Sequence, residues 1–204
     1  MAEAMNVLYP IGDKLYVNLT NRCSCDCTFC LRNAADGAHG SDTLWLVREP
    51  SFEEVMAAFD DYAMEDVTEV VFCGYGEPTC AFDRLVAVAR AVKERWGKPV
   101  RVNTNGQGSL ICGRDIAPEL EGVVDALSIS LNTPDAARYL ELTRSRFGEE
   151  AFPAMLDFAR RARTYVPDVT LTTVATTLSP EEEQACQRLC DELGVRYRIR
   201  PWVD

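Results

Sequence analysis

The sequence alternates between short runs of β-forming residues and longer runs with helical periodicity. Six strand-like runs cover residues 14–20, 67–73, 100–104, 124–131, 169–176 and 195–199. Because a helical crossover separates each pair of runs, every strand starts from the same end of the sheet. A closed eight-stranded barrel needs about 250 residues, and this chain has 204. The sequence therefore predicts an α/β fold, a partial open TIM-like (β/α)6 barrel with parallel strands, in a single domain spanning residues 1–204.

Two helix starts stand out between these strands. Ser51 and Glu54 have the spacing of a capping box. Ser179 precedes Pro180 and three glutamates, which is typical of an N-cap and first turn. Further helices are expected over residues 82–96 and 115–120, and from 133 to about 166 with an interruption near 148–153.

Composition narrows the classes of function. The formal net charge is −11, which argues against a nucleic-acid substrate because the surface should repel phosphate backbones, unless a local basic groove overrules the average. No run of about 18 apolar residues occurs, so we expect no contact with a membrane. The number of cysteines is nine, which is odd, and no export signal is evident at the start of the sequence. Reduced thiols in a cytoplasmic protein are therefore expected.

Four of the nine cysteines lie within eight residues, directly after the first expected strand. Cys23, Cys27 and Cys30 have the spacing C-x3-C-x2-C. Three thiolates at one place can hold three corners of a cubane iron-sulfur cluster and leave the fourth iron open to another ligand. Cys25 lies between these ligands and is interpreted as a spare thiol.

This cysteine spacing, with the aromatic Phe29 before the last cysteine, resembles the signature of the radical S-adenosylmethionine (radical SAM) enzymes. Residues 16–23 look most like the branch known as TatD-associated radical SAM proteins. The resemblance implies that a [4Fe-4S] cluster on Cys23, Cys27 and Cys30 reductively cleaves S-adenosylmethionine (SAM). The resulting 5′-deoxyadenosyl radical would abstract hydrogen from a substrate that these motifs do not specify. Expected partners are an electron donor such as flavodoxin or ferredoxin and, as a functional partner, a TatD-family hydrolase.

Residues 74–78, Gly-Tyr-Gly-Glu-Pro, are similar to the Gly-Gly-Glu motif that binds the methionyl amino group of SAM in this family. Gly74, Gly76 and Glu77 match the motif, whereas Tyr75 stands where many members have a glycine. A plain tight turn is the alternative. Phe29 resembles the aromatic residue near the adenine, with core packing as its alternative.

Polar residues at the ends of later strands are further SAM-binding candidates. Asn105 belongs to the polar end of the third expected strand, and Ser130 and Asn132 to that of the fourth, where a hydroxyl and amide row suits a ribose or a carboxylate. Capping of the next helix is the alternative for Asn132. Arg144, expected inside that helix, is interpreted either as a ligand of the methionyl carboxylate or as a solvated charge.

Strand periodicity also places polar side chains inside the barrel. They are Tyr16, Asn18, Arg101, Asn103, Ser128, Ser130, Arg198 and Arg200. Arginines in a barrel interior indicate a substrate that carries a carboxylate or a phosphate. The alternative is that arginines on the last strand only discourage edge pairing. The loop over residues 33–46, which contains the single histidine His39, is expected to close over the mouth of the barrel, with a partner subunit or a large substrate as the alternatives.

Cysteines elsewhere are interpreted as structural. Cys186 and Cys190 belong to one apolar helix stripe, and Cys73, Cys80 and Cys112 are isolated in the sequence. Two other classes of function remain open: an iron-sulfur electron carrier, which would need a fourth protein ligand, and a zinc-binding interaction module.

Overall fold

The computed structural model of the protein describes residues 5–33 and 43–201. One sheet holds seven strands in the order of the sequence, and every neighbouring pair from β2 to β7 is parallel. The strands are β1 (Leu8–Ile11), β2 (Lys14–Val17), β3 (Glu69–Phe72), β4 (Val100–Thr104), β5 (Ala126–Ser130), β6 (Asp168–Val174) and β7 (Arg196–Arg200). The six expected parallel strands are confirmed, and with them the partial open barrel.

The sequence analysis missed β1, which forms an antiparallel hairpin with β2. The strand contains Pro10, which has no backbone N–H to donate and is typical of turns and sheet edges. At the edge of the sheet the missing donor costs little, and Gly12, with φ of 60°, makes the tight return. The hairpin thus adds an antiparallel edge to an otherwise parallel sheet.

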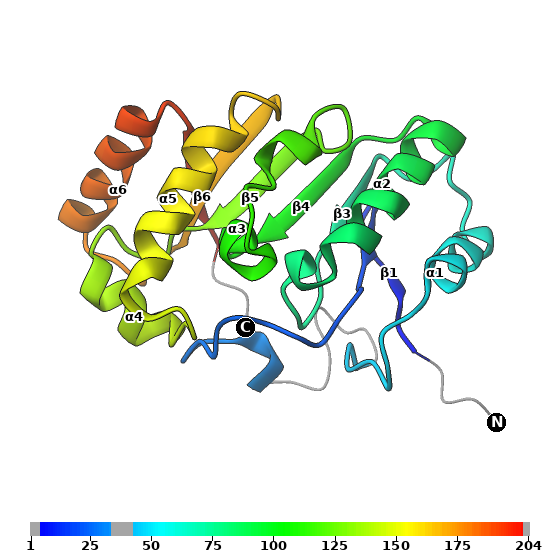
Figure 1. Ribbon diagram of the computed structural model, residues 1–204, viewed down its shortest axis with the longest axis horizontal. Helices are drawn as coiled ribbons and strands as arrows, with labels where there is room; N and C mark the ends of the chain where they lie inside the picture. Colours follow the sequence, from blue (N-terminus) through cyan, green and yellow to red (C-terminus); the bar gives the residue numbers. More distant parts are fainter. Residues whose placement is uncertain (1–4, 34–42, 202–204) are drawn as a thin grey trace.

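The helices are α1 (Phe52–Ala58), α2 (Phe82–Trp96), α3 (Gly108–Cys112), α4 (Ala136–Thr143), α5 (Ala151–Ala162) and α6 (Pro180–Leu193). In Figure 1, α2, α3 and α5 lie in front of the sheet, between α1 at one end and α6 at the other. The expected helix over residues 115–120 is only a 3-10 turn, Ala117–Leu120, and α3 was not expected. The predicted interruption is present as the 3-10 turn Gly148–Glu150.

Both predicted helix starts are confirmed, and each carries a capping box. Ser51 accepts a hydrogen bond from the Glu54 backbone, Ser179 accepts one from the Glu182 backbone, and each glutamate side chain returns to its cap. The four bonds satisfy donors that helix starts leave free. None of the helices in the described ranges is long and apolar enough to cross a membrane.

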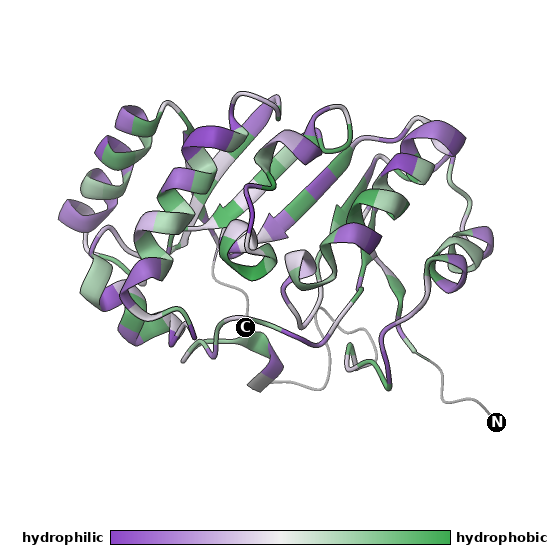
Figure 2. Ribbon diagram, viewed as in Figure 1, coloured by the Kyte–Doolittle hydropathy of each residue, from purple (hydrophilic) through white to green (hydrophobic). Residues whose placement is uncertain are grey.

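The hydrophobic core lies between the sheet and its helices. In Figure 2, green hydrophobic segments alternate with purple hydrophilic ones along the strands behind α2, α3 and α5. Fully buried members are Phe72, Leu85, Ile129, Met155, Phe158 and Leu171. Cys186 and Cys190 on α6 are also fully buried, which confirms their structural interpretation. The opposite face of the sheet carries the polar residues, so the two faces of each strand divide between core and barrel interior.

Replacing Leu85 by alanine tests the core of α2. Leu85 is 0% exposed, so Leu85→Ala should lower the free energy of unfolding by about 2–5 kcal/mol through the lost burial and the cavity left behind. Urea denaturation followed by circular dichroism measures the change. Arg90→Ala, at an exposed position of the same helix, should stay within about 0.5 kcal/mol of wild type; equal losses in both variants would contradict this account.

Candidate functional site

The cysteine loop follows β2 and is bonded to the C-terminal end of α4. The backbone N–H groups of Asp26 and Thr28 donate to the carbonyls of Thr143 and Leu142, at 2.9 and 3.0 Å. The Arg146 N–H donates to the Ser24 carbonyl at 2.9 Å. Because the last carbonyls of a helix have no partner within it, α4 offers acceptors at the place where the loop needs them.

Gln107 holds the same loop from the other side and is completely buried. Its Oε1 accepts from the hydroxyls of Ser24 and Ser145, each at 2.8 Å. Its Nε2 donates to the Tyr139 hydroxyl at 3.1 Å and towards the Cys25 sulfur at 3.3 Å. One amide therefore joins the cysteine loop, α4 and the segment after β4. Sequence reasoning missed it, although it directly follows the polar end of the strand over residues 100–104.

The four loop cysteines differ in exposure. Cys25 is only 5% exposed, whereas Cys23, Cys27 and Cys30 are half-buried. All nine cysteines are free thiols. For Cys25, a hydrogen bond with Cys23 lowers the pKa, but hydrogen bonding with Cys27 and burial outweigh it and raise the pKa to about 12. The three thiols at 23, 25 and 27 are thus neighbours.

Cys23, Cys27 and Cys30 have the sulfur donors that a thiolate-bound iron-sulfur cluster needs. The Asn105 amide lies 3.9 Å from the Cys23 sulfur and could donate a hydrogen bond there. Within residues 5–33 and 43–201, no three histidine, cysteine, aspartate or glutamate side chains converge closely enough to hold a metal ion. Cluster binding therefore requires the half-exposed thiols to turn towards one another on a loop whose backbone is already held.

The turn over residues 74–78 packs directly on the end of β2. A Cβ on Gly74 would lie 2.1 Å from Oδ1 of Asn18, and one on Gly76 would lie 2.1 Å from the Thr20 carbonyl oxygen. Only glycine fits at these contacts. Tyr75, the departure from the motif, is buried and makes an edge contact with Trp45 at 5.2 Å between ring centroids.

Glu77 ends this turn with a buried carboxylate. Oε1 accepts from the hydroxyls of Thr79 and Thr104 at 2.7 and 2.6 Å, and Oε2 accepts from the Asn105 N–H at 2.7 Å. Burial raises the pKa of Glu77, against the lowering effect of these bonds. The carboxylate thereby ties the glycine turn to the end of β4. Asn105 in turn donates from Nδ2 to the Ser24 hydroxyl at 2.9 Å.

Asn18 carries an unsatisfied acceptor beside the glycine turn. Its Nδ2 donates to the Leu44 carbonyl at 2.7 Å, but its buried Oδ1 has no hydrogen-bond partner among the described residues. An unpaired buried acceptor is costly.

The other predicted residues lie around this centre in different settings. Ser130 is half-buried on β5 and pairs in register with Thr172. Asn132 is 9% exposed with φ of 65°, and the cap of α4 is Asp135, so the capping alternative for Asn132 is wrong. Phe29 is 43% exposed, so its core-packing alternative is wrong as well.

Arg144 does not lie inside a helix, as the sequence analysis expected. It is the exposed C-cap residue of α4, with φ of 46°. It stands between Thr143 and Ser145, which both take part in holding the cysteine loop. The predicted lid over residues 33–46 falls mostly outside the described residues, and His39 lies there too. Its end at Leu46 exchanges two hydrogen bonds with the Asn21 side chain, at 2.7 and 3.0 Å.

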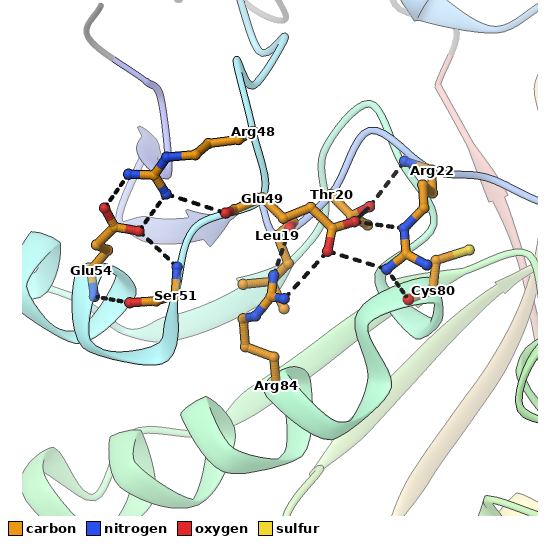
Figure 3. Close-up of polar contacts among 9 residues, drawn as sticks. All are labelled: Leu19, Thr20, Arg22, Arg48, Glu49, Ser51, Glu54, Cys80 and Arg84. Atoms are coloured by element: carbon orange, nitrogen blue, oxygen red, sulfur yellow. Dashed lines mark hydrogen bonds and ion pairs between the residues drawn. The ribbon is translucent and has the colours of Figure 1, made fainter. Parts of the chain in front are cut away.

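A second polar centre, which sequence reasoning missed, fixes the entry to the cysteine loop (Figure 3). Glu49 accepts from the Thr20 hydroxyl and from Arg22 Nε, both at 2.6 Å, and from Arg84 at 3.3 Å. Burial opposes ionisation, but the bonds to Arg22 and Thr20 prevail and lower the pKa of Glu49. Arg22 also donates to the Cys80 carbonyl at 2.7 Å. A single carboxylate thus joins β2, α2 and the loop.

A hollow of about 430 Å³ lies beside this centre. It is lined by Arg22, Cys23, Thr79, Cys80, Phe82, Asp83, Ile111, Cys112, Arg114 and Arg146. Cys80 and Cys112, isolated in the sequence, therefore share a surface with Cys23.

The profile of the Radical SAM superfamily matches residues 17–199. The chain belongs to the radical SAM superfamily. This is a family of enzymes that use a [4Fe-4S] cluster and SAM.

Matches to three individual relatives cover most of this chain but less than half of each relative. A GTP 3′,8-cyclase of Lactiplantibacillus plantarum is 30% identical over 145 residues, 69% of this chain and 41% of that protein. A probable dual-specificity RNA methyltransferase RlmN of Porphyromonas gingivalis is 27% identical over 155 residues, 74% of this chain and 41% of that protein. The solved structure of Streptococcus suis SuiB bound to S-adenosylmethionine superposes with a TM-score of 0.62 at 20% identity, covering 93% of this chain and 38% of SuiB. The chain thus spans about two-fifths of the length of these relatives.

Replacing Gln107 by methionine tests the buried amide. Gln107→Met keeps the volume but leaves the hydroxyls of Ser24 and Ser145 without their acceptor, so the free energy of unfolding should fall by about 1–3 kcal/mol. Chemical denaturation measures it. Gln187→Met, at an exposed position on α6, is the matched control and should change little. A Gln107→Met protein as stable as wild type would contradict the role assigned to the amide.

Proposed function

We propose that this protein binds a [4Fe-4S] cluster through Cys23, Cys27 and Cys30 and uses SAM to start radical chemistry on a substrate. The observation that carries the proposal is the loop itself. It presents three half-exposed free thiols at the carboxyl edge of a parallel sheet, in a chain matched from residue 17 to 199 by the superfamily profile. The carboxyl edge is where such sheets place their active sites. Cys25, buried and hydrogen-bonded by Gln107, is left out of the ligand set.

The proposed SAM site lies next to that loop. The ammonium of SAM has donors only, and the glycines of the turn over residues 74–78 allow backbone carbonyl acceptors to approach it closely. Gly76 and Glu77 complete this side of the site. The remaining proposed contacts are Phe29 at the adenine, Asn105, Ser130 and Asn132 at the ribose or carboxylate, and Arg144 at the methionyl carboxylate.

When bound, the cluster and SAM supply a one-electron reductive cleavage that gives methionine and a 5′-deoxyadenosyl radical able to abstract hydrogen from carbon. The protein's own contribution is positional. Gln107 holds the loop at Ser24, Glu49 holds it at Arg22, and Glu77 holds the glycine turn against β4. These bonds, of which those of Gln107 and Glu77 are buried, fix the two halves of the site relative to each other before any ligand arrives.

Several finer assignments are proposals of the same kind. We place the chain in the TatD-associated branch, on the resemblance of residues 16–23, with a TatD-family hydrolase as functional partner. Flavodoxin or ferredoxin is the proposed electron donor. A cytoplasmic location is supported by nine free cysteines, since cytosolic thiols stay reduced. One continuous sheet supports a single radical SAM core domain over residues 1–204.

Single cysteine variants test the ligand set. Cys23→Ser, Cys27→Ser and Cys30→Ser should each lose most iron and sulfide after anaerobic reconstitution, together with absorption near 400 nm, because three thiolates are needed to hold the cluster. Cys25→Ser, the matched control from the same loop, should keep the cluster. Loss of the cluster in Cys25→Ser with retention in Cys27→Ser would overturn the assignment.

Product analysis tests the function itself. The reduced, reconstituted protein should convert SAM to 5′-deoxyadenosine and methionine, measured by chromatography. Iron and sulfide without SAM cleavage would instead favour an electron carrier, and bound zinc without sulfide would favour an interaction module.

A further inference from the structure

The inner face of the sheet is basic although the chain carries a net charge of −11. Strand register and pleating place seven charged side chains on this face: Lys14, Glu69, Arg101, Asp168, Arg196, Arg198 and Arg200. Five of them are basic and two are acidic, which leaves a surplus of three positive charges. Part of this face is hollowed, with a volume of about 270 Å³ lined by Arg101, Ser128 and Arg198 among others.

Both carboxylates on this face are already paired. Glu69 accepts from Lys14 and Arg101, each at 2.9 Å. Asp168 pairs with Arg196. The remaining two cations, Arg198 and Arg200, are alternate residues of β7 on the same face.

Neither of these arginines has an acidic partner among the described residues. Arg198 donates to the neutral Ser128 hydroxyl at 3.3 Å. Arg200 is half-buried, and its Nε is fully buried without a hydrogen-bond partner in the described part of the chain. Burial, and then the nearby Arg198, lower the pKa of Arg200, against the opposing effect of Cys73.

A buried N–H without an acceptor costs about 1–3 kcal/mol, and two adjacent guanidinium groups repel each other. Edge protection, the alternative given by the sequence, needs a charge on the edge strand but no acceptor for a buried N–H group. It explains Arg196 and Arg198, which are exposed, but not the buried Nε of Arg200. An anion bound between the two guanidinium groups would cancel this repulsion and offer acceptors to their terminal N–H donors.

Building on the proposed function, we propose that Arg198 and Arg200 form the subsite for a phosphoryl group of the substrate. A phosphate ester carries up to two negative charges and several acceptor oxygens, which match two planar guanidinium forks better than a single carboxylate does. Arg200 ends β7, and the cysteine loop follows the end of β2. Because parallel strands bring their carboxyl ends to one edge, the anchored phosphoryl group would direct the rest of the substrate towards the proposed radical site.

Anion titrations of the reconstituted protein, carried out both with and without SAM, test the subsite. Inorganic phosphate and acetate are the probes, and binding is followed by phosphorus-31 and proton NMR. Wild type should bind phosphate at least tenfold more tightly than acetate. Arg198→Gln and Arg200→Gln should each weaken phosphate binding at least tenfold. Arg188→Gln, which removes one exposed charge from α6, controls for net charge and should bind as wild type does.

Two further readouts distinguish a phosphoryl subsite from a SAM contact and from a purely structural arginine pair. SAM affinity, measured by equilibrium dialysis, should be the same in Arg200→Gln and wild type. The melting temperature of Arg200→Gln should not fall, because the variant removes a partly buried positive charge that is repelled by Arg198. Equal binding of phosphate and acetate, no phosphate binding by wild type, or equal losses in Arg188→Gln would overturn the subsite. Failure of the wild type to bind or cleave SAM would instead refute the proposed function, since phosphate binding is measured independently.

Discussion

The buried amide of Gln107 is the interaction on which the candidate site depends most directly. It satisfies two serine hydroxyls, contacts a tyrosine hydroxyl and approaches the sulfur of Cys25, and all of these lie in the interior. A buried polar network is stable only when its members are satisfied together. The cysteine loop, the end of α4 and the segment after β4 are therefore held as one unit. The half-exposed thiols project from a backbone that has little freedom to move.

Buried hydrogen bonds also hold the glycine turn over residues 74–78 in place. Glu77 has a buried carboxylate whose oxygens accept four hydrogen bonds, from the backbone and hydroxyl of Thr79, the Thr104 hydroxyl and the Asn105 backbone. Gly74 and Gly76 let this turn touch the segment that follows β2, at Asn18 and Thr20, at distances that no side chain would allow. The turn and the cysteine loop thus share one support, because Asn105 touches both Glu77 and Ser24. In the described part of the chain, two buried side-chain polar atoms have no hydrogen-bond partner, Asn18 Oδ1 and Arg200 Nε. Preorganised ligand sites need groups that their surroundings hold in place, and this frame holds the turn and the loop in that way.

Much of the fold could be predicted because it rests on local patterns. Strand alternation, the helix caps at Ser51 and Ser179, and the apolar stripe with Cys186 all depend on residues a few positions apart. The elements and the residue that were predicted wrongly also have local causes. Pro10 concealed an edge strand, and the short α3 lacks a side-chain cap. Arg144 was placed inside a helix because nothing in its neighbourhood marks the left-handed residue that ends α4.

By itself, the sequence determined the parallel α/β architecture and the thiol spacing, since both are written in short-range periodicity. It also brought the candidate residues to one edge, because parallel strands share their carboxyl ends. Only the tertiary structure decided which groups hold them there. Ser24 and Gln107 are 83 positions apart, and Arg22 and Glu49 are 27 apart. No local pattern links such partners, because a buried hydrogen bond depends on which side chains the packed fold leaves facing each other. The same packing left Arg200 with a buried donor and no acceptor among the described residues, which its place in the sequence could not reveal.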